Sequence, residues 1–303
     1  MKQTDTAELM RRVRGIRILA SKLVDEALAG GYRSSFRGQG LEFDEIRAYE
    51  PGDDVRAIDW NVTAKAGFPQ IKRFVEERQL TVVFLVDVSG SQSFGSGART
   101  KAERAAELCC LLSLVSLRNR DDVGLVLFAE GVVKAIPPRK GRGSAMRIVR
   151  EVLAAQDATG GGTDLKGALE WLGAVQRRRA VVFVVSDFQC DGWQKALSAL
   201  ASRHDVVCCA ISDPAERRLP SAGLVEFEDP ETGETAWADL SSAAVRRQWA
   251  EFSQARRDAL KADLKRSGAD ALFFDEDEDP APALRKFFRA RAVLRNRGAR
   301  GGR

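Results

Sequence analysis

Short apolar runs alternate with amphipathic segments between about residue 80 and residue 275. The clearest runs are rich in β-branched and aromatic residues, and they cover residues 82–86, 123–128, 180–185 and 206–211. Runs of this kind are typical of strands buried on both faces of a parallel sheet. The segments between them have apolar residues at helical spacing. Strands separated by helices predict an α/β fold with a doubly wound, mostly parallel sheet flanked by helices.

The pattern changes on both sides of this region. Residues 1–30 predict an amphipathic helix that ends at Gly30-Gly31, and residues 31–79 predict a β-rich extension of strands and turns fixed by ion pairs. An inserted β-hairpin is expected at 219–240, packed beside that extension. Residues 276–303 are expected to form an acidic linker, a basic helix and a disordered tail. The α/β domain itself is expected to span 80–275.

Charge is distributed unevenly along the 303 residues. The net charge is +5, but residues 281–303 hold eight basic side chains and no acid, which leaves −3 for the first 280 residues. A mildly acidic body argues against a nucleic-acid surface across the whole protein. The basic tail admits binding to nucleic acid or to an anionic surface. Docking of the last helix through Leu284, Phe287 and Phe288 is the interpretation that we favour.

Two absences from the sequence predict a cytoplasmic protein. No apolar run has the length needed to cross a bilayer, and the N-terminus lacks the apolar centre of a secretory signal. The five cysteines form no CxxC spacing, and two pairs, Cys109-Cys110 and Cys208-Cys209, lie inside apolar segments. Buried, reduced thiols are therefore expected rather than a zinc site or a disulfide framework.

Oxygen-bearing side chains follow two of the predicted strands and one glycine-rich loop. Asp87, Ser89 and Ser91 come directly after the first strand, Thr163 follows Gly160–Gly162, and Asp187 follows another central strand. Parallel strands place their carboxyl ends at one edge of a sheet, so we expect the three segments to meet there. A site of carboxylates and hydroxyls, without sulfur or imidazole, suits Mg²⁺ first and Mn²⁺ second.

Other interpretations of these residues are weaker. Asp and Ser after a strand can simply cap the next helix. Haloacid-dehalogenase-like phosphotransferases need a second aspartate where this chain has Ser89, and receiver domains need a further acidic pair. The only histidine, His204, starts a strand at the opposite edge of the sheet, so a Ser–His pair is not expected. No phosphate-binding loop motif follows a strand, which argues against nucleotide binding by this chain.

The DxSxS segment, the distant threonine and the later aspartate together resemble the metal-ion-dependent adhesion site of von Willebrand factor type A domains. That resemblance implies a von Willebrand factor A-like fold, in which Ser89, Ser91 and Thr163 would be metal ligands. Asp87 and Asp187 would act directly or through water. One open position on the metal would accept an acidic side chain from a partner.

A wider resemblance, to the domain-of-unknown-function 58 (DUF 58) family, spans most of residues 30–290. Its most specific part is EFDEIRAYEPGDDVRAIDWNVTAK at 42–65, followed by DVSGS, GLVLF, GGTDL, VSDF and DPETGE. Many members carry two transmembrane helices before this region, whereas this chain has a charged helix there, which implies a version without them. The family is commonly encoded beside MoxR-type AAA+ ATPases, and the resemblance implies such an ATPase as the partner.

The expectation is a protein-interaction module rather than an enzyme. It would use a divalent metal to bind an acidic partner residue, as an adaptor between a MoxR-type ATPase and a client protein. A metal-dependent phosphoester hydrolase is the alternative from another class, although a general base and a second metal-binding acidic cluster are lacking. A structural subunit with an empty metal site is the third interpretation.

Overall fold

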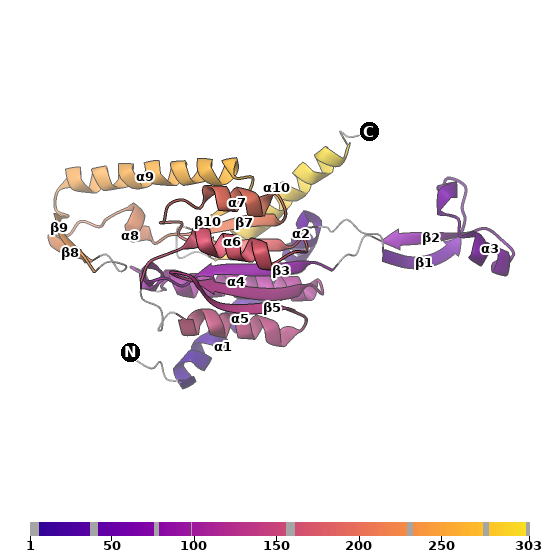
Figure 1. The fold of residues 1–303 in the computed structure, drawn as a ribbon, viewed down its shortest axis with the longest axis horizontal. Helices are drawn as coiled ribbons and strands as arrows, with labels where there is room; N and C mark the ends of the chain where they lie inside the picture. Colours follow the sequence, from indigo (N-terminus) through magenta and orange to yellow (C-terminus); the bar gives the residue numbers. More distant parts are fainter. Residues whose placement is uncertain are drawn as a thin grey trace.

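A six-stranded sheet forms the centre of the molecule (Figure 1). The computed structural model describes residues 6–36, 42–75, 79–97, 99–155, 161–228, 233–274 and 279–300. The strand order is β10-β7-β6-β3-β4-β5, and every pairing is parallel except that of β5 with β4. The predicted α/β class with a mostly parallel sheet is confirmed. The strands are β3 (Thr81–Asp87), β4 (Asp122–Phe128), β5 (Val132–Arg139), β6 (Val181–Ser186), β7 (Asp205–Ile211) and β10 (Asp270–Phe274).

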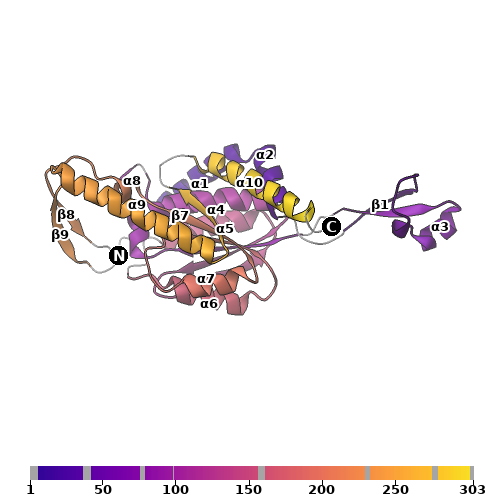
Figure 2. The ribbon, with the colours of Figure 1, turned by 90° about the horizontal axis from the view of Figure 1, so that it is seen from above.

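Helices cover both faces of this sheet (Figure 2). Successive side chains of a strand point to opposite faces, so Val82 and Phe84 of β3 pack in one layer while Val83 and Leu85 pack in the other. The first layer contains α1 (Thr6–Leu23), α2 (Glu26–Phe36), α4 (Lys101–Arg118), α5 (Arg142–Ala155) and α10 (Pro280–Arg300). The second layer contains α6 (Leu165–Val175), α7 (Gln194–Ala201) and α9 (Ala243–Arg266). Two apolar layers explain why the central strands are apolar throughout.

The N-terminal helical region continues beyond Gly30-Gly31, where the sequence pattern predicts its end. The helix is interrupted at residues 24–25 instead, and the chain then forms α2 as far as Phe36. Tertiary packing explains the difference, because Tyr32 and Phe36 are buried against Phe288 of α10. Gly31 suits this contact, since a Cβ there would lie only 3.3 Å from the Phe288 Cβ.

The contact between α2 and α10 gives a first testable prediction. The buried Ser35 hydroxyl lies 2.7 Å from the Phe288 carbonyl oxygen and 2.8 Å from that of Gly31. Replacing Ser35 by alanine should lower the free energy of unfolding by about 1 kcal/mol, the usual net value of such a bond. Urea denaturation measures this change. Ser202→Ala is the control, because the exposed Ser202 hydroxyl bonds only locally to Ala199, and an equal loss there would contradict the prediction.

Residues 42–75 form an arm that projects from the body in both views (Figures 1 and 2). Strands β1 (Glu42–Ala48) and β2 (Gln70–Val75) pair antiparallel, and the chain between them forms a 3₁₀ turn, η1 (Val55–Ala57), and the helix α3 (Trp60–Ala66). The expectation of strands and turns without helix is therefore wrong for α3. Asp59 explains this helix, because its carboxylate caps the N–H groups of Asn61 and Val62.

The inserted hairpin is present but does not lie beside the arm. Its strands are β8 (Leu224–Glu228) and β9 (Thr235–Asp239), which pair antiparallel. Of the turn predicted at 229–233, residues 229–232 lie outside the described residues. The arm and the hairpin lie at opposite ends of the molecule (Figure 1). The prediction that the hairpin packs beside the arm, which was based on their similar composition, is therefore wrong. The arm enters at the start of β3, whereas the hairpin follows the carboxyl end of β7.

The basic C-terminal helix packs on the body as predicted. Leu284 and Phe288 of α10 are fully buried, and Phe287 packs at the edge of the same layer. Arg291 contacts Asp205 and lies 2.9 Å from Asp270, with its guanidinium 4.6 Å from the centre of the Phe36 ring. The helix extends to Arg300, so the expectation of a disordered tail at 298–303 is wrong for residues 298–300. Residues 275–278 of the expected linker and 301–303 of the tail lie outside the described residues. Among the described residues, no helix has both the length and the apolar character to cross a membrane.

Four of the five cysteines are buried, as predicted. Cys109 and Cys110 of α4 and Cys208 and Cys209 of β7 are fully buried, whereas Cys190, in the segment after β6, is only partly buried. Burial raises the pKa of Cys110 to about 12 and that of Cys109 well above its usual value. These buried thiols therefore behave as small apolar side chains.

Candidate metal centre

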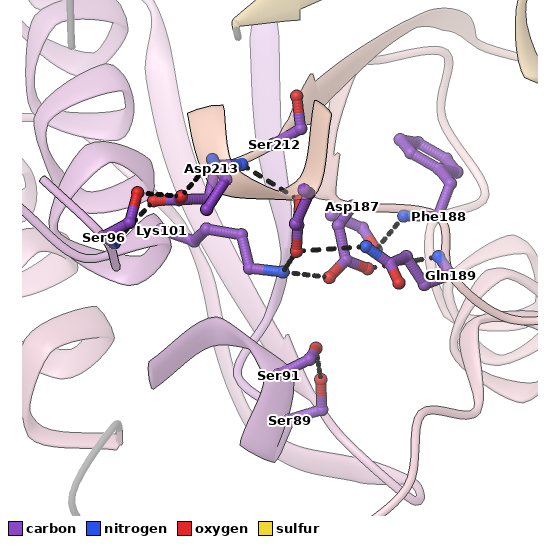
Figure 3. Close-up of polar contacts among 12 residues, drawn as sticks. Ser89, Ser91, Ser96, Lys101, Asp187, Phe188, Gln189, Ser212 and Asp213 are labelled. Carbon is purple, nitrogen blue, oxygen red and sulfur yellow. Dashed lines mark hydrogen bonds and ion pairs between the residues drawn. The ribbon is translucent and has the colours of Figure 1, made fainter. Parts of the chain in front are cut away.

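Asp87, Ser89 and Ser91 form a buried cluster at the carboxyl end of β3. Figure 3 shows the Ser89 and Ser91 side chains facing each other. The Ser89 hydroxyl donates to Asp87 Oδ1 at 2.7 Å, and the Ser89 and Ser91 oxygens are 3.1 Å apart. Ser89 occupies the N-cap position of the 3₁₀ turn η2 (Gly90–Ser93), yet its side chain makes no capping bond. The structure therefore does not support a capping role for the Ser89 side chain, and the serine oxygens lie close to each other and to the Asp87 carboxylate instead.

Ser186 joins this cluster from the neighbouring strand, and the sequence analysis missed it. Its hydroxyl donates to Asp87 Oδ2 at 2.7 Å and accepts a bond from the Phe188 N–H at 3.0 Å. The register of β3 and β6 explains the contact, since Val86 pairs with Val185 and the next residues on each strand are Asp87 and Ser186. A parallel, in-register pairing of the two strands was the signal that could have identified Ser186.

Burial raises the pKa of Asp87 to about 6, and the nearby Asp187 carboxylate adds to the shift. Hydrogen bonds from Ser89 and Ser186 oppose the shift because they stabilise the ionised form. A carboxylate that is ionised at neutral pH but costly to bury would gain stability from a nearby cation. The cluster therefore has the electrostatic character of a cation site.

Lys101 supplies a cation next to this cluster. It is the first residue of α4, its side chain is 1% exposed, and its Nζ lies 2.7 Å from both Asp187 Oδ2 and Glu216 Oε1 (Figure 3). Burial alone would lower the pKa of Lys101, but the two carboxylates outweigh burial and the pKa is raised. The sequence analysis missed this residue. A lysine in the first turn of a helix lies at the positive end of the helix dipole, where a cation is unfavourable without nearby acids. This position was the available sequence signal that Lys101 pairs with carboxylates.

Asp213 holds Glu216 in position for this ion pair. The fully buried Asp213 carboxylate accepts bonds from the Ser96 N–H, the Ser96 hydroxyl and the Arg104 guanidinium. It also caps α8 (Pro214–Arg217), in which the Glu216 side chain accepts the Asp213 N–H at 3.0 Å. The Asp213-Pro214 pair with Glu216 three residues after the aspartate matches a capping box, which was the sequence signal for this element.

The loop that carries Thr163 lies beside the cluster. The Gly90 N–H donates to the Gly161 carbonyl at 3.5 Å, and the Asp164 N–H donates to the Ala129 carbonyl at 2.7 Å. These contacts bring the segment before α6 against the turn that carries Ser89 and Ser91. The five predicted residues therefore come from three segments that meet at one edge of the sheet. His204, in contrast, accepts the Ala180 N–H at the amino edge, away from both serines.

The residues of this edge fit a hard divalent cation by their chemistry. Asp87, Ser89 and Ser91 offer carboxylate and hydroxyl oxygens, the ligands that Mg²⁺ prefers, and Thr163 would add another hydroxyl. Within the described part of the chain, no group of three or more His, Cys, Asp or Glu residues could hold a metal. The hydroxyls would thus be essential ligands. Lys101 partly neutralises Asp187, so a metal would be held more weakly than by two unpaired carboxylates.

Several solved structures match this chain at low sequence identity. An aerotolerance-related membrane protein from Bacteroides fragilis matches with a TM-score of 0.48 and 16% identity, covering 71% of this chain and 99% of the other. BatB from Bacteroides thetaiotaomicron matches with a TM-score of 0.47 and 17% identity over the same shares. The SpRpn10 VWA domain matches with a TM-score of 0.36 and 13% identity, covering 68% and 94% of the two chains.

Sequence relatives extend over nearly the whole chain. The uncharacterized protein Rv1480 of Mycobacterium tuberculosis is 28% identical over 300 residues, which are 98% of this chain and 93% of the relative. The uncharacterized protein MAV169 of Mycobacterium avium is 31% identical over 170 residues, covering 55% of this chain and 98% of the relative. Residues 45–259 match the family described as "Protein of unknown function DUF58". That match covers more than half of the chain, which therefore belongs to the DUF58 family.

Proposed function

We propose that this protein is a cytoplasmic interaction module that binds an acidic side chain of a partner through a divalent metal, Mg²⁺ or Mn²⁺. The observation that carries the proposal is the buried cluster of Asp87, Ser89 and Ser91 at the carboxyl edge of the sheet. Asp87, Ser89, Ser91 and Thr163 would hold the metal, with Asp187 acting through water. The metal would supply an open coordination position for the carboxylate of the partner.

The neighbourhood of the cluster favours binding over hydrolysis. Phosphoester hydrolysis with two metals needs a second set of carboxylates about 4 Å from the first metal site. Here the nearest acid, Asp187, is paired with the Lys101 ammonium at 2.7 Å. A cation in that position supports a single metal that binds a ligand, and not a pair of metals that activates water.

Metal binding can be tested by calorimetry. We expect Mg²⁺ and Mn²⁺ to release or absorb heat on binding to the wild type, and the signal to vanish in the double variant Ser89→Ala, Ser91→Ala. Ser113→Ala is the matched control, because this buried serine of α4 lies twelve residues after Lys101, about 18 Å along the helix. Absence of any difference between the wild type and the double variant would remove the metal from the proposal.

The partner that the family resemblance implies is a MoxR-type AAA+ ATPase, with this protein as an adaptor for a client. A purified MoxR-type ATPase from the same organism should bind the wild type in Mg²⁺ and be released by EDTA. The double variant Ser89→Ala, Ser91→Ala should bind no ATPase in either buffer. Binding that persists in EDTA would contradict the metal bridge while leaving the pairing of the two proteins intact.

A further inference from the structure

The far end of the arm is apolar and acidic. Val55 of η1 and Trp60 of α3 are 59% and 68% exposed, which is unusual for large apolar side chains. Residues 47–60 contain four acids, Glu50, Asp53, Asp54 and Asp59, against two bases, Arg47 and Arg56, for a net charge of −2. Arg47 lies 2.7 Å from Asp53 and 3.7 Å from Glu50. A two-stranded arm of this size is marginally stable alone, and its exposed apolar end is typical of a contact surface.

A cleft at the opposite end of the molecule has the complementary character. It has a volume of about 180 Å³ and lies where β6, β7 and β10 end against α8 and α9. Small-molecule pockets usually measure roughly 300–1,000 Å³, so this cleft suits one or two side chains rather than a cofactor. Its apolar surface is formed by Trp249, Phe252 and Phe273, and Phe252 is 61% exposed.

Basic side chains surround this apolar surface. Arg217, Arg256 and Arg257 line the cleft, and the Arg257 guanidinium lies 4.5 Å from the centre of the Phe273 ring. The acids of the cleft, Asp187 and Glu216, both contact Lys101. Three arginines and one lysine against two carboxylates give a local charge of +2. The cleft therefore favours an apolar side chain flanked by carboxylates, which is the character of the arm end.

The arm cannot reach the cleft of its own molecule. It joins the body just before Thr81, at the amino end of β3, whereas the cleft contains Asp187, Ile211 and Phe273 from the carboxyl ends of strands. A seven-residue strand separates these two edges by about 23 Å. The arm also points away from α9 in both views (Figures 1 and 2). Only another molecule can bring the two surfaces together.

We propose that the arm of one copy of this protein inserts Val55 and Trp60 into the cleft of a second copy. The carboxylates of Glu50 and Asp54 would face the arginines of the cleft, and Trp60 would pack against Trp249 and Phe252. This head-to-tail contact leaves one arm and one cleft unused, so further copies add at both ends. The contact uses none of the metal-site hydroxyls and therefore goes beyond the proposed function.

Sedimentation velocity over a range of protein concentrations tests this proposal. The wild type should form concentration-dependent dimers and longer chains, in EDTA as well as in Mg²⁺. Trp60→Ser, which removes the arm contact, and Arg256→Glu, which reverses charge in the cleft, should each weaken association by at least about 30-fold, as for central interface residues. The controls are Trp237→Ser, an equally exposed tryptophan of β9, and Arg247→Glu, an exposed arginine of α9 outside the cleft.

A mixing experiment separates this contact from damage to the fold. Trp60→Ser retains an intact cleft and Arg256→Glu retains an intact arm, so an equimolar mixture should form a dimer and stop there. A wild type that remains monomeric at its highest attainable concentration would overturn the proposal and would indicate that the arm binds another protein. A mixture that stays monomeric would overturn the proposal as well. So would control variants that associate as weakly as Trp60→Ser and Arg256→Glu.

Discussion

Replacing Lys101 by methionine should lower the free energy of unfolding by about 3–5 kcal/mol. The methionine fills a similar volume, but it leaves the carboxylates of Asp187 and Glu216 without the ammonium that lies 2.7 Å from each. Asp187 is itself buried, and breaking a buried ion pair by removing one partner leaves an uncompensated charge. Urea denaturation at pH 7 in EDTA measures the loss.

Lys134→Met is the matched control for this variant. Lys134 also contacts a carboxylate, that of Glu151, but its side chain is 45% exposed to water. Exposed ion pairs contribute about 0–1 kcal/mol, so this variant should lose little stability. Lys101→Met should also bind Mg²⁺ more tightly than the wild type, because the substitution removes one positive charge beside Asp187. Equal losses of stability in the two lysine variants would show that Lys101 is not essential to this edge of the sheet.

At pH 8 in EDTA, the free energy of unfolding of Asp87→Asn should exceed that of the wild type by up to about 3 kcal/mol. The pKa of Asp87 is raised by burial from 3.8 to about 6, and each pKa unit corresponds to about 1.4 kcal/mol. Because the folded protein prefers the protonated carboxyl, this favourable contribution is complete below about pH 4 and is lost as the pH rises through 6. The advantage of the asparagine variant should therefore disappear towards pH 4.

Magnesium should reverse the order of stability at pH 8. A cation that binds only the folded wild type stabilises it by mass action, and asparagine cannot supply the charge that holds the metal. Asp121→Asn is the control, because burial also raises the pKa of Asp121 to about 6, at a place where Tyr32 and Leu80 donate to it. It should show the same dependence on pH and leave the response to Mg²⁺ unchanged. Thermal unfolding of all three proteins with and without Mg²⁺ measures both effects.

Local sequence patterns were sufficient for the α/β domain. Residues 181–185 of β6 are all apolar because both faces of the sheet are covered, and that condition leaves a clear apolar run in the sequence. The course of the chain before residue 80 was harder to predict. Gly30 and Gly31 usually end a helix, but here Tyr32 and Phe36 gain a buried position against Phe288 from a helix that continues. Contacts between residues so far apart in sequence cannot be inferred from local propensity.

The sequence named Asp87, Ser89 and Ser91, which the structure brings together, but not Ser186 or Lys101. Asp87, Ser89 and Ser91 adjoin one another in sequence, so their proximity follows from a single turn. Lys101 reaches Asp187 from a helix that starts fourteen residues after Asp87, and Glu216 reaches Lys101 from beyond β7. A lysine in a sequence is normally assigned to the surface, and only the packed fold shows that this one is buried.

The thiols give the protein a reporter that needs no mutation. Four of the five cysteines are enclosed in the core, and burial raises the pKa of Cys110 to about 12, so these four do not react with maleimides near pH 7. Cys190 is the partly exposed exception, and it lies three residues after Asp187. Its backbone carbonyl accepts the Trp193 indole N–H. A fluorophore attached to the natural chain would therefore label one position, beside the carboxyl edge of the sheet, and its emission could follow cation binding directly.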